Sequence, residues 1–98
     1  MNEITVSQLS ELTGVTLIDV REPDEYAAVR VPGAINIPLG TLADVQLPEG
    51  EVYVICQLGG RSAKATEYLT GTGVTATNVA GGTSAWVQAG LPTDSGTA

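Results

Sequence analysis

Short apolar segments rich in β-branched residues alternate along this chain with segments that carry helical signals. The apolar runs cover residues 16–20, 52–55 and 74–79, and a helix-forming segment follows each of them. Parallel strands are buried on both faces, so their sequences are nearly continuous apolar runs, and their crossover connections are usually helical. The alternation therefore predicts an α/β fold, a three-layer sandwich in which helices flank a central, mostly parallel sheet.

Residues that favour helix ends locate further elements. Ser7 is a suitable N-cap for a short helix up to Leu12, and Pro23 with the acids after it is typical of a first helical turn. The remaining predicted elements are a strand over 34–37 and helices over 39–45, 62–70 and 83–89.

The length of 98 residues is typical of one small domain. We expect a single domain over 1–98, with a core over about 4–92 and a frayed C-terminal tail over 93–98. A hydrophobic content of 43% supports a globular fold, and the absence of Phe means that Val, Leu, Ile and Ala form most of the core.

The single cysteine, Cys56, ends the apolar run of residues 51–55 and precedes two glycines, Arg61 and a predicted helix. Sites in parallel α/β sheets form beyond the carboxyl ends of strands. A glycine-rich turn and a helix start favour negative charge, and they lower the pKa of such a thiol from about 8.5 to roughly 3.5–7.5. Many free cysteines are only small buried hydrophobic residues. The position of Cys56 instead predicts a nucleophilic thiolate, largely ionised at neutral pH.

The length of the cysteine loop bears on which group it can bind. Six residues run from Cys56 to Arg61, one fewer than in the Cys-x5-Arg loops with which cysteine phosphatases bind a tetrahedral oxyanion. A smaller ring of N–H donors suits a smaller group, such as the terminal sulfur of a persulfide. The chain has no histidine, which excludes Cys–His catalysis, and one cysteine alone cannot supply the usual zinc ligands. We expect neither a metal nor a cofactor.

The net charge of −7 limits the partners of this chain. Four basic residues are too few for binding to nucleic acids or to anionic membranes. Arg61 lies in the cysteine loop, which gives the loop local positive charge suited to a small anion. Lys64 follows one turn later, and two alternatives stay open for it: it enlarges this anion site or it is solvated. We expect Arg30 to be solvated, with contact to a substrate as the alternative.

The cysteine count also bears on the compartment. One cysteine cannot form an internal disulfide, whereas small secreted domains usually carry several. Residues 1–5 lack the features of a signal peptide, and no apolar stretch approaches the ~18–20 residues of a membrane span. These features favour a reducing cytoplasm.

Four sequence blocks together resemble the rhodanese-like domain in its single-domain sulfurtransferase form. The likeness extends over roughly 7–92, and the blocks follow the order and spacing of that family, which makes the combination specific. The blocks are Leu17–Tyr26, Val31–Pro38, Cys56–Ser62, and the paired segments Val79–Trp86 and Ala89–Pro92.

The resemblance implies a five-stranded parallel sheet and ping-pong transfer of sulfane sulfur. Cys56 would take the outer sulfur of thiosulfate or of a persulfide and pass it to cyanide, to a small thiol or to a thioredoxin-like protein. Arg61 would help to bind the anionic donor, and Ser62 would cap the helix. The backbone N–H groups that would hold the persulfide belong to Gln57, Leu58, Gly59, Gly60, Arg61 and Ser62.

Residues near the loop are expected to support it rather than to react. Asp19 ends an apolar strand, and its expected hydrogen-bond partner is Arg21 or a loop N–H. Gly81 and Gly82 are expected to form a tight turn that approaches the loop closely. Leu58 is apolar where many family members carry a polar or charged residue, which disfavours small hydrophilic donors.

Other functions remain open from the sequence. A binding or regulatory module would keep the fold without turnover, although family members of that kind usually lack the cysteine. A persulfide carrier for a partner protein is a further alternative. The six-residue ring disfavours a phosphatase more than an arsenate reductase. A redox-sensing thiol is also open, but the chain has no second cysteine to resolve an oxidised Cys56. The oligomeric state is equally open.

Overall fold

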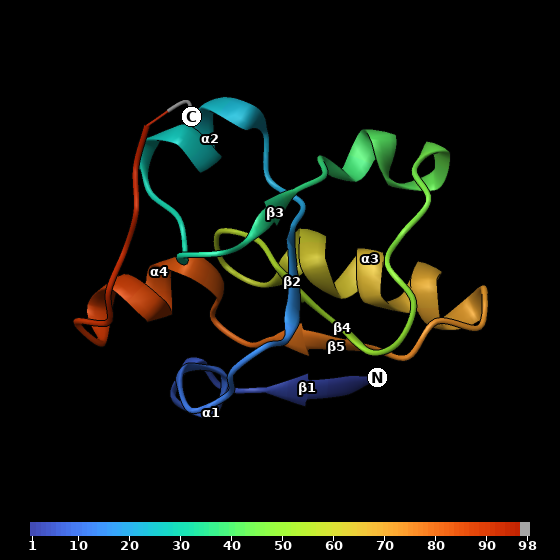
Figure 1. Ribbon diagram of the computed structural model, residues 1–98, viewed down its shortest axis with the longest axis horizontal. Coiled ribbons are helices and arrows are strands. Elements are labelled where there is room, and N and C mark those ends of the chain that lie inside the picture. The colour runs from blue at the N-terminus through green and yellow to red at the C-terminus, as the bar shows by residue number, and fades with distance from the viewer. Residues whose placement is uncertain (97–98) are drawn as a thin grey trace.

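A parallel five-stranded sheet forms the centre of the computed structural model, which describes residues 1–96 (Figure 1). The strands are β1 (Asn2–Ile4), β2 (Thr16–Asp19), β3 (Ile35–Asn36), β4 (Val52–Ile55) and β5 (Ala76–Val79). Their order is β1-β5-β4-β2-β3, and every adjacent pair is parallel. The predicted α/β class and the five-stranded sheet are therefore confirmed.

Helices cover both faces of this sheet. They are α1 (Val6–Ser10), α2 (Pro23–Ala28), the 3₁₀ helix η1 (Leu39–Asp44), α3 (Gly60–Gly71) and α4 (Gly82–Gln88). Because successive strand residues point to opposite faces, the core has two parts. Ile18 packs with Leu69 of α3 on one face, whereas its neighbour Leu17 packs with Leu9 of α1 and Trp86 of α4 on the other.

The N-terminal segment differs from the expectation in two respects. The sequence does not predict β1, a strand of only three residues that lies at the edge of the sheet and pairs with β5. Helix α1 is capped by Thr5 and not by Ser7, which lies inside the helix. The Thr5 hydroxyl accepts from the Gln8 N–H at 3.1 Å, and the Gln8 side chain accepts from the Thr5 N–H at 2.9 Å. This reciprocal capping box satisfies two N–H groups at once, which Ser7 could not do.

The C-terminal segment is paired with the rest of the fold, so the prediction of a frayed tail is wrong as far as Gly96. Asp94 and Arg30 exchange two backbone hydrogen bonds of 2.9 Å, and the Gly96 N–H donates to the Ala27 carbonyl at 2.7 Å. Figure 1 shows the segment running to the side of α2. The last two residues of the predicted tail, 97–98, lie outside the described residues.

Arg30 holds this segment in place and is not the solvated side chain that the sequence suggests. Its guanidinium donates to the Gly96 carbonyl at 2.8 Å and lies 4.6 Å from the centre of the Tyr26 ring. Only 9% of the residue is exposed. Cation–π stacking and the carbonyl bond therefore occupy this cation.

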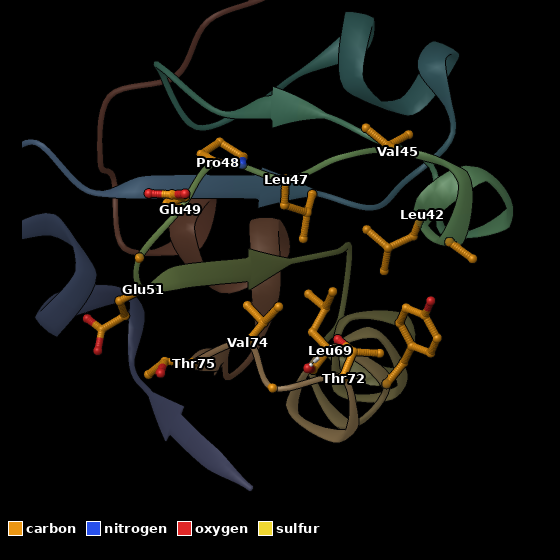
Figure 2. A pocket seen from close by; sticks show the side chains of 14 residues that line it. Leu42, Val45, Leu47, Pro48, Glu49, Glu51, Leu69, Thr72, Val74 and Thr75 are labelled. Atoms are coloured by element: carbon orange, nitrogen blue, oxygen red, sulfur yellow. Dashed lines mark hydrogen bonds between the residues drawn. The ribbon is translucent and has the colours of Figure 1, made fainter.

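A cavity of about 750 Å³ lies among η1, the turn before β4 and the C-terminal part of α3 (Figure 2). Its lining includes Glu51 and Thr75, which precede β4 and β5. The cavity thus lies at the amino ends of these strands, on the side of the sheet opposite to the carboxyl ends where Cys56 lies. Within residues 1–96, no helix has the length and apolar content that a membrane crossing requires.

Candidate functional site

The loop that follows β4 places Cys56 at the start of α3. Gly59 caps this helix with φ of 112°, a left-handed conformation that glycine adopts readily and other residues avoid. Gly60 is the first residue of α3 and Arg61 the second. The sequence prediction that the helix starts at Ser62 is therefore wrong by two residues, because the cap is a backbone conformation and not a side-chain oxygen.

The sulfur of Cys56 accepts hydrogen bonds from within the loop. The Gly59 N–H donates to Sγ at 3.0 Å, and the Ser62 hydroxyl lies 3.3 Å from Sγ. The same hydroxyl lies 3.2 Å from the Gly59 carbonyl, and it has one proton to donate. Ser62 is fully buried, and its hydroxyl contacts the sulfur, whereas the N-cap of α3 is Gly59.

These contacts change the acidity of the thiol. Burial raises the pKa of Cys56, because the charged form loses its hydration. The hydroxyl and N–H of Ser62, together with the N–H groups of Gly59 and Leu58, lower the pKa by more than that. The pKa of Cys56 therefore lies below its ordinary value, which is the direction that the sequence predicts.

Two residues of the loop differ strongly in exposure. Cys56 is 1% exposed, whereas Leu58 is 73% exposed. A reagent that reaches the sulfur must therefore pass the side chains of the loop, and Leu58 presents an apolar surface to it.

The start of α4 supports the loop from behind. The Cys56 carbonyl accepts from the Thr83 N–H at 2.9 Å and from the Thr83 hydroxyl at 3.1 Å, and the Gln57 carbonyl accepts from the Ser84 N–H at 3.0 Å. A Cβ on Gly82 would lie 2.4 Å from the Cys56 carbonyl oxygen. The expected close approach of the Gly81–Gly82 turn to the loop is thus present. The contacts of Thr83 and Ser84 with the loop were not predicted from the sequence.

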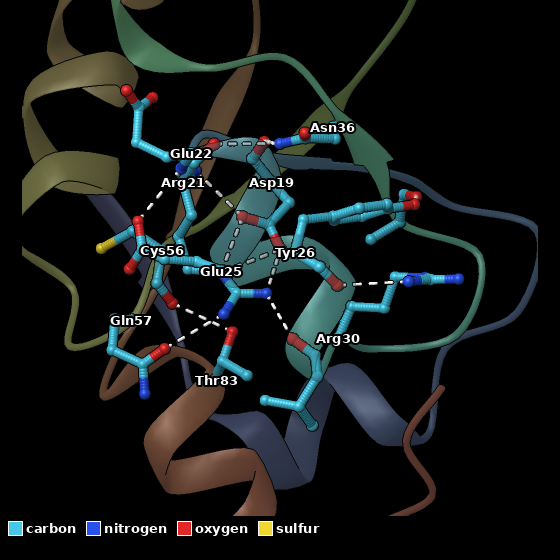
Figure 3. A network of polar contacts seen from close by, with 12 residues as sticks. Asp19, Arg21, Glu22, Glu25, Tyr26, Arg30, Asn36, Cys56, Gln57 and Thr83 are labelled. Atoms are coloured by element: carbon cyan, nitrogen blue, oxygen red, sulfur yellow. Dashed lines mark hydrogen bonds and ion pairs between the residues drawn. The ribbon is translucent and has the colours of Figure 1, made fainter. Parts of the chain in front are cut away.

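A buried ion pair lies beside the loop on the β2 side (Figure 3). The Arg21 guanidinium donates to both Asp19 carboxylate oxygens, with Nη2 2.8 Å from Oδ2, and both residues are at most 1% exposed. Its Nη1 donates to the Gln57 side chain at 3.1 Å, and its Nη2 also donates to the Val29 carbonyl at 2.7 Å. Asp19 therefore has the partner expected from the sequence, and Arg21 links β2 to the loop.

Arg61 is also paired, through a contact that the sequence analysis missed. Its Nη1 lies 2.7 Å from Glu25 Oε1, and its Nη2 lies 2.9 Å from Oε2, so the pair is bidentate. The hydrogen bond from Arg61 lowers the pKa of Glu25 from 4.5 to about 2, against an opposing effect of burial. Glu25 also accepts from the Glu22 N–H at 3.0 Å as part of the cap of α2. From the sequence, Glu25 stood out only as one of the acids in the first turn of a helix and as part of the Leu17–Tyr26 block.

The site consists of a thiol, backbone and hydroxyl donors, and charges that are paired. Among residues 1–96, no group of three or more His, Cys, Asp or Glu side chains is placed to hold a metal ion. The arrangement can stabilise a thiolate and a second sulfur bonded to it, since N–H groups and a hydroxyl converge on Sγ.

Comparison with known proteins agrees with this geometry. A family model described as the rhodanese-like domain matches residues 5–89. The chain belongs to the rhodanese-like domain family. The solved rhodanese-related protein from Thermoplasma volcanium superposes with a TM-score of 0.89 at 33% identity, covering 96% of this chain and 98% of that one.

Relatives of similar length are named as sulfurtransferases. A sulfurtransferase from Allochromatium vinosum is 32% identical, covering 93% of this chain and 89% of its own length. Thiosulfate sulfurtransferase 16 of Arabidopsis thaliana is 37% identical, with 92% and 88% covered. Other relatives are longer: the chain spans 52% of an uncharacterized protein of Synechocystis that is 40% identical to it. The two relatives named as sulfurtransferases are thus matched over most of their own length.

Proposed function

We propose that this rhodanese-like protein carries sulfane sulfur on Cys56, between a small sulfur donor and a thiol acceptor. The observation that carries the proposal is the pair of donors on Sγ: the Gly59 N–H at 3.0 Å and the Ser62 hydroxyl at 3.3 Å. They stabilise the attacking thiolate, and backbone N–H groups of residues 57–62 are available to the persulfide that follows.

In the first half-reaction, the Cys56 thiolate attacks the outer sulfur of thiosulfate. A bond forms between Sγ and that sulfur, the donor's own S–S bond breaks, and its electron pair leaves with sulfite. The reactants and products both carry three negative charges, so the step needs no oxidant, reductant or proton. A persulfide donor R–S–SH reacts in the same way and releases RS⁻.

In the second half-reaction, an acceptor attacks the outer sulfur of the Cys56 persulfide. The new bond forms between the acceptor and that sulfur, and the electron pair of the broken bond returns to Sγ as thiolate. Cyanide leaves as thiocyanate, and a thiol leaves as a persulfide. The acceptor that we propose is a small thiol or the thiol of a thioredoxin-like protein.

The proposal is tested by the intact mass of the protein after incubation with thiosulfate, without a reductant. We expect a gain of one sulfur atom that is lost on addition of cyanide or a thiol. A Cys56→Ser variant should remain folded and gain nothing. If neither thiosulfate nor a persulfide adds sulfur to Cys56, the domain is a binding module without turnover.

A further inference from the structure

Arg61 is the cation of the cysteine loop, and Glu25 already occupies it. Nη1 and Nη2 of its guanidinium each donate to one oxygen of the Glu25 carboxylate, at 2.7 and 2.9 Å. The side chains of Arg61 and Glu25 are 39% and 30% exposed, so the pair lies where a dissolved anion can reach it. An anionic donor that uses Arg61 must therefore compete with a carboxylate held at the same nitrogens.

Two of the three remaining cations, Arg21 and Arg30, are occupied by other contacts. Arg21 is buried and bound to Asp19, and Arg30 is bound to the Gly96 carbonyl and stacked on Tyr26. Lys64 is exposed on α3, one turn after Arg61. Because the chain has a net charge of −7, attraction of a dianion to the loop depends strongly on how free the Arg61 guanidinium is.

We propose that Glu25 is a specificity-determining residue of this site. It competes with anionic sulfur donors for Arg61, and this competition weakens the binding of a donor more when the donor carries more negative charge. The inference rests on the proposed function of Cys56. It favours donors of low charge, and a donor with an apolar substituent can in addition contact the exposed Leu58.

Two donors with matched sulfur chemistry separate charge from reactivity. Thiosulfate is a dianion and releases sulfite, whereas methanethiosulfonate is a monoanion and releases methanesulfinate. In both, the Cys56 thiolate takes the terminal sulfur and the electron pair of the broken S–S bond leaves with the oxidised sulfur. The ratio of their KM values therefore reports how the site responds to donor charge.

The test variant is Glu25→Gln, which removes the negative charge. Its amide oxygen can still accept the hydrogen bond that the Glu22 N–H donates to Glu25 at 3.0 Å. We expect the KM for thiosulfate to fall roughly two- to fivefold, the range of an exposed ion pair, and the KM for methanethiosulfonate to fall less. The matched control is Asp24→Asn, which changes the net charge equally on the same helix, on an exposed residue. It should leave the KM ratio unchanged.

A second pair of variants tests whether Arg61 transmits the effect. In an Arg61→Gln background, Glu25→Gln should no longer change the KM for thiosulfate, because no guanidinium is left for which Glu25 and thiosulfate can compete. An equal fall of kcat for both donors in Glu25→Gln, or a KM ratio that does not change, would overturn the proposal in favour of a structural role for Glu25.

A binding measurement keeps this inference separate from the proposed function. Thiosulfate is titrated into the Cys56→Ser protein while the Nε–H signal of Arg61 is followed by NMR. Glu25→Gln should tighten the dissociation constant roughly two- to fivefold. If binding does not change, the competition is rejected even when Cys56 accepts sulfur. If binding tightens while wild-type protein accepts no sulfur, the proposed function fails and the competition stands.

Discussion

At the scale of single residues, the chemistry of this site depends on how one sulfur atom is solvated. Cys56 is 1% exposed, so water cannot supply the stabilisation that a thiolate needs. Protein donors take that role, among them the Gly59 N–H and the Ser62 hydroxyl. The hydroxyl is the donor that mutation can remove without disturbing the backbone.

Replacement of Ser62 by Ala should raise the pKa of Cys56, because the thiolate then loses a hydrogen-bond donor that favours its charged form. The thiolate then forms only at higher pH, so reactivity near neutral pH falls. The pH dependence of the alkylation rate measures this shift. Ser84→Ala is the matched control, because the Ser84 side chain accepts from Gln88 and makes no contact with the sulfur. An unchanged midpoint in Ser62→Ala would show that backbone N–H groups suffice.

At the scale of elements, two helices hold the loop from different sides. The N-terminus of α4 binds the carbonyls of Cys56 and Gln57, and Glu25 of α2 binds Arg61 of α3. Neither contact lies within one element, so each depends on how the elements pack.

Gly82→Ala should destabilise the protein by more than the strain of its backbone alone. The residue has φ of +58°, and a Cβ would lie 2.4 Å from the Cys56 carbonyl oxygen and 2.7 Å from that of Gln57. Gly90→Ala is the control, because Gly90 has φ of +72° and no atom within 4 Å of its Cβ position. Backbone strain costs about 1–3 kcal/mol in both. Chemical denaturation should show a larger loss of unfolding free energy for Gly82→Ala than for Gly90→Ala. Equal losses would mean that the loop moves away from the added Cβ at no cost in free energy.

The ion pair between α2 and α3 should make stability depend on pH in a defined window. Folding lowers the pKa of Glu25 from 4.5 to about 2, so the unfolded chain binds the proton more tightly. The stabilisation is complete above about pH 4.5 and is lost as the pH falls towards 2. The difference in unfolding free energy between wild type and Glu25→Gln should shrink over this range. In an Arg61→Gln background the shrinkage should be absent, and its persistence would assign the effect to another group.

At the scale of the whole molecule, the buried pair of Asp19 and Arg21 connects the carboxyl end of β2 with the site. The guanidinium joins β2 to the Gln57 side chain and to the Val29 carbonyl at the end of α2. A pair of this kind is costly to break, because the remaining charge has no water around it.

Asp19→Asn should therefore lower the unfolding free energy by about 3 kcal/mol, as expected when a buried charge loses its partner. Asp44→Asn serves as the control: Asp44 is exposed in η1, and a surface change of this kind costs at most about 0.5 kcal/mol. Urea denaturation measures both. Similar values for the two variants would show that Arg21 is satisfied by Val29 and Gln57 alone.

Most of the strands and the position of the thiol could be predicted from local patterns. The apolar runs ending at Asp19 and Ile55 have the continuous form of buried parallel strands, and the place of Cys56 after the second run indicated the site. The strand β1 could not be predicted, because its three residues form a strand only by pairing with β5. The docking of Asp94 on Arg30 was missed for the same reason.

The sequence by itself determined the fold class, the position of the single cysteine after a strand and the six-residue loop, since each follows from residue types at short spacing along the chain. Only the tertiary structure decided the state of the charges. Arg61 and Glu25 are 36 residues apart, as are Arg21 and Gln57, and no local pattern joins them. The physical reason is that a charged side chain pairs with a partner that is close in space. The crossovers of a parallel sheet bring segments that are distant in the sequence together at the carboxyl ends of the strands.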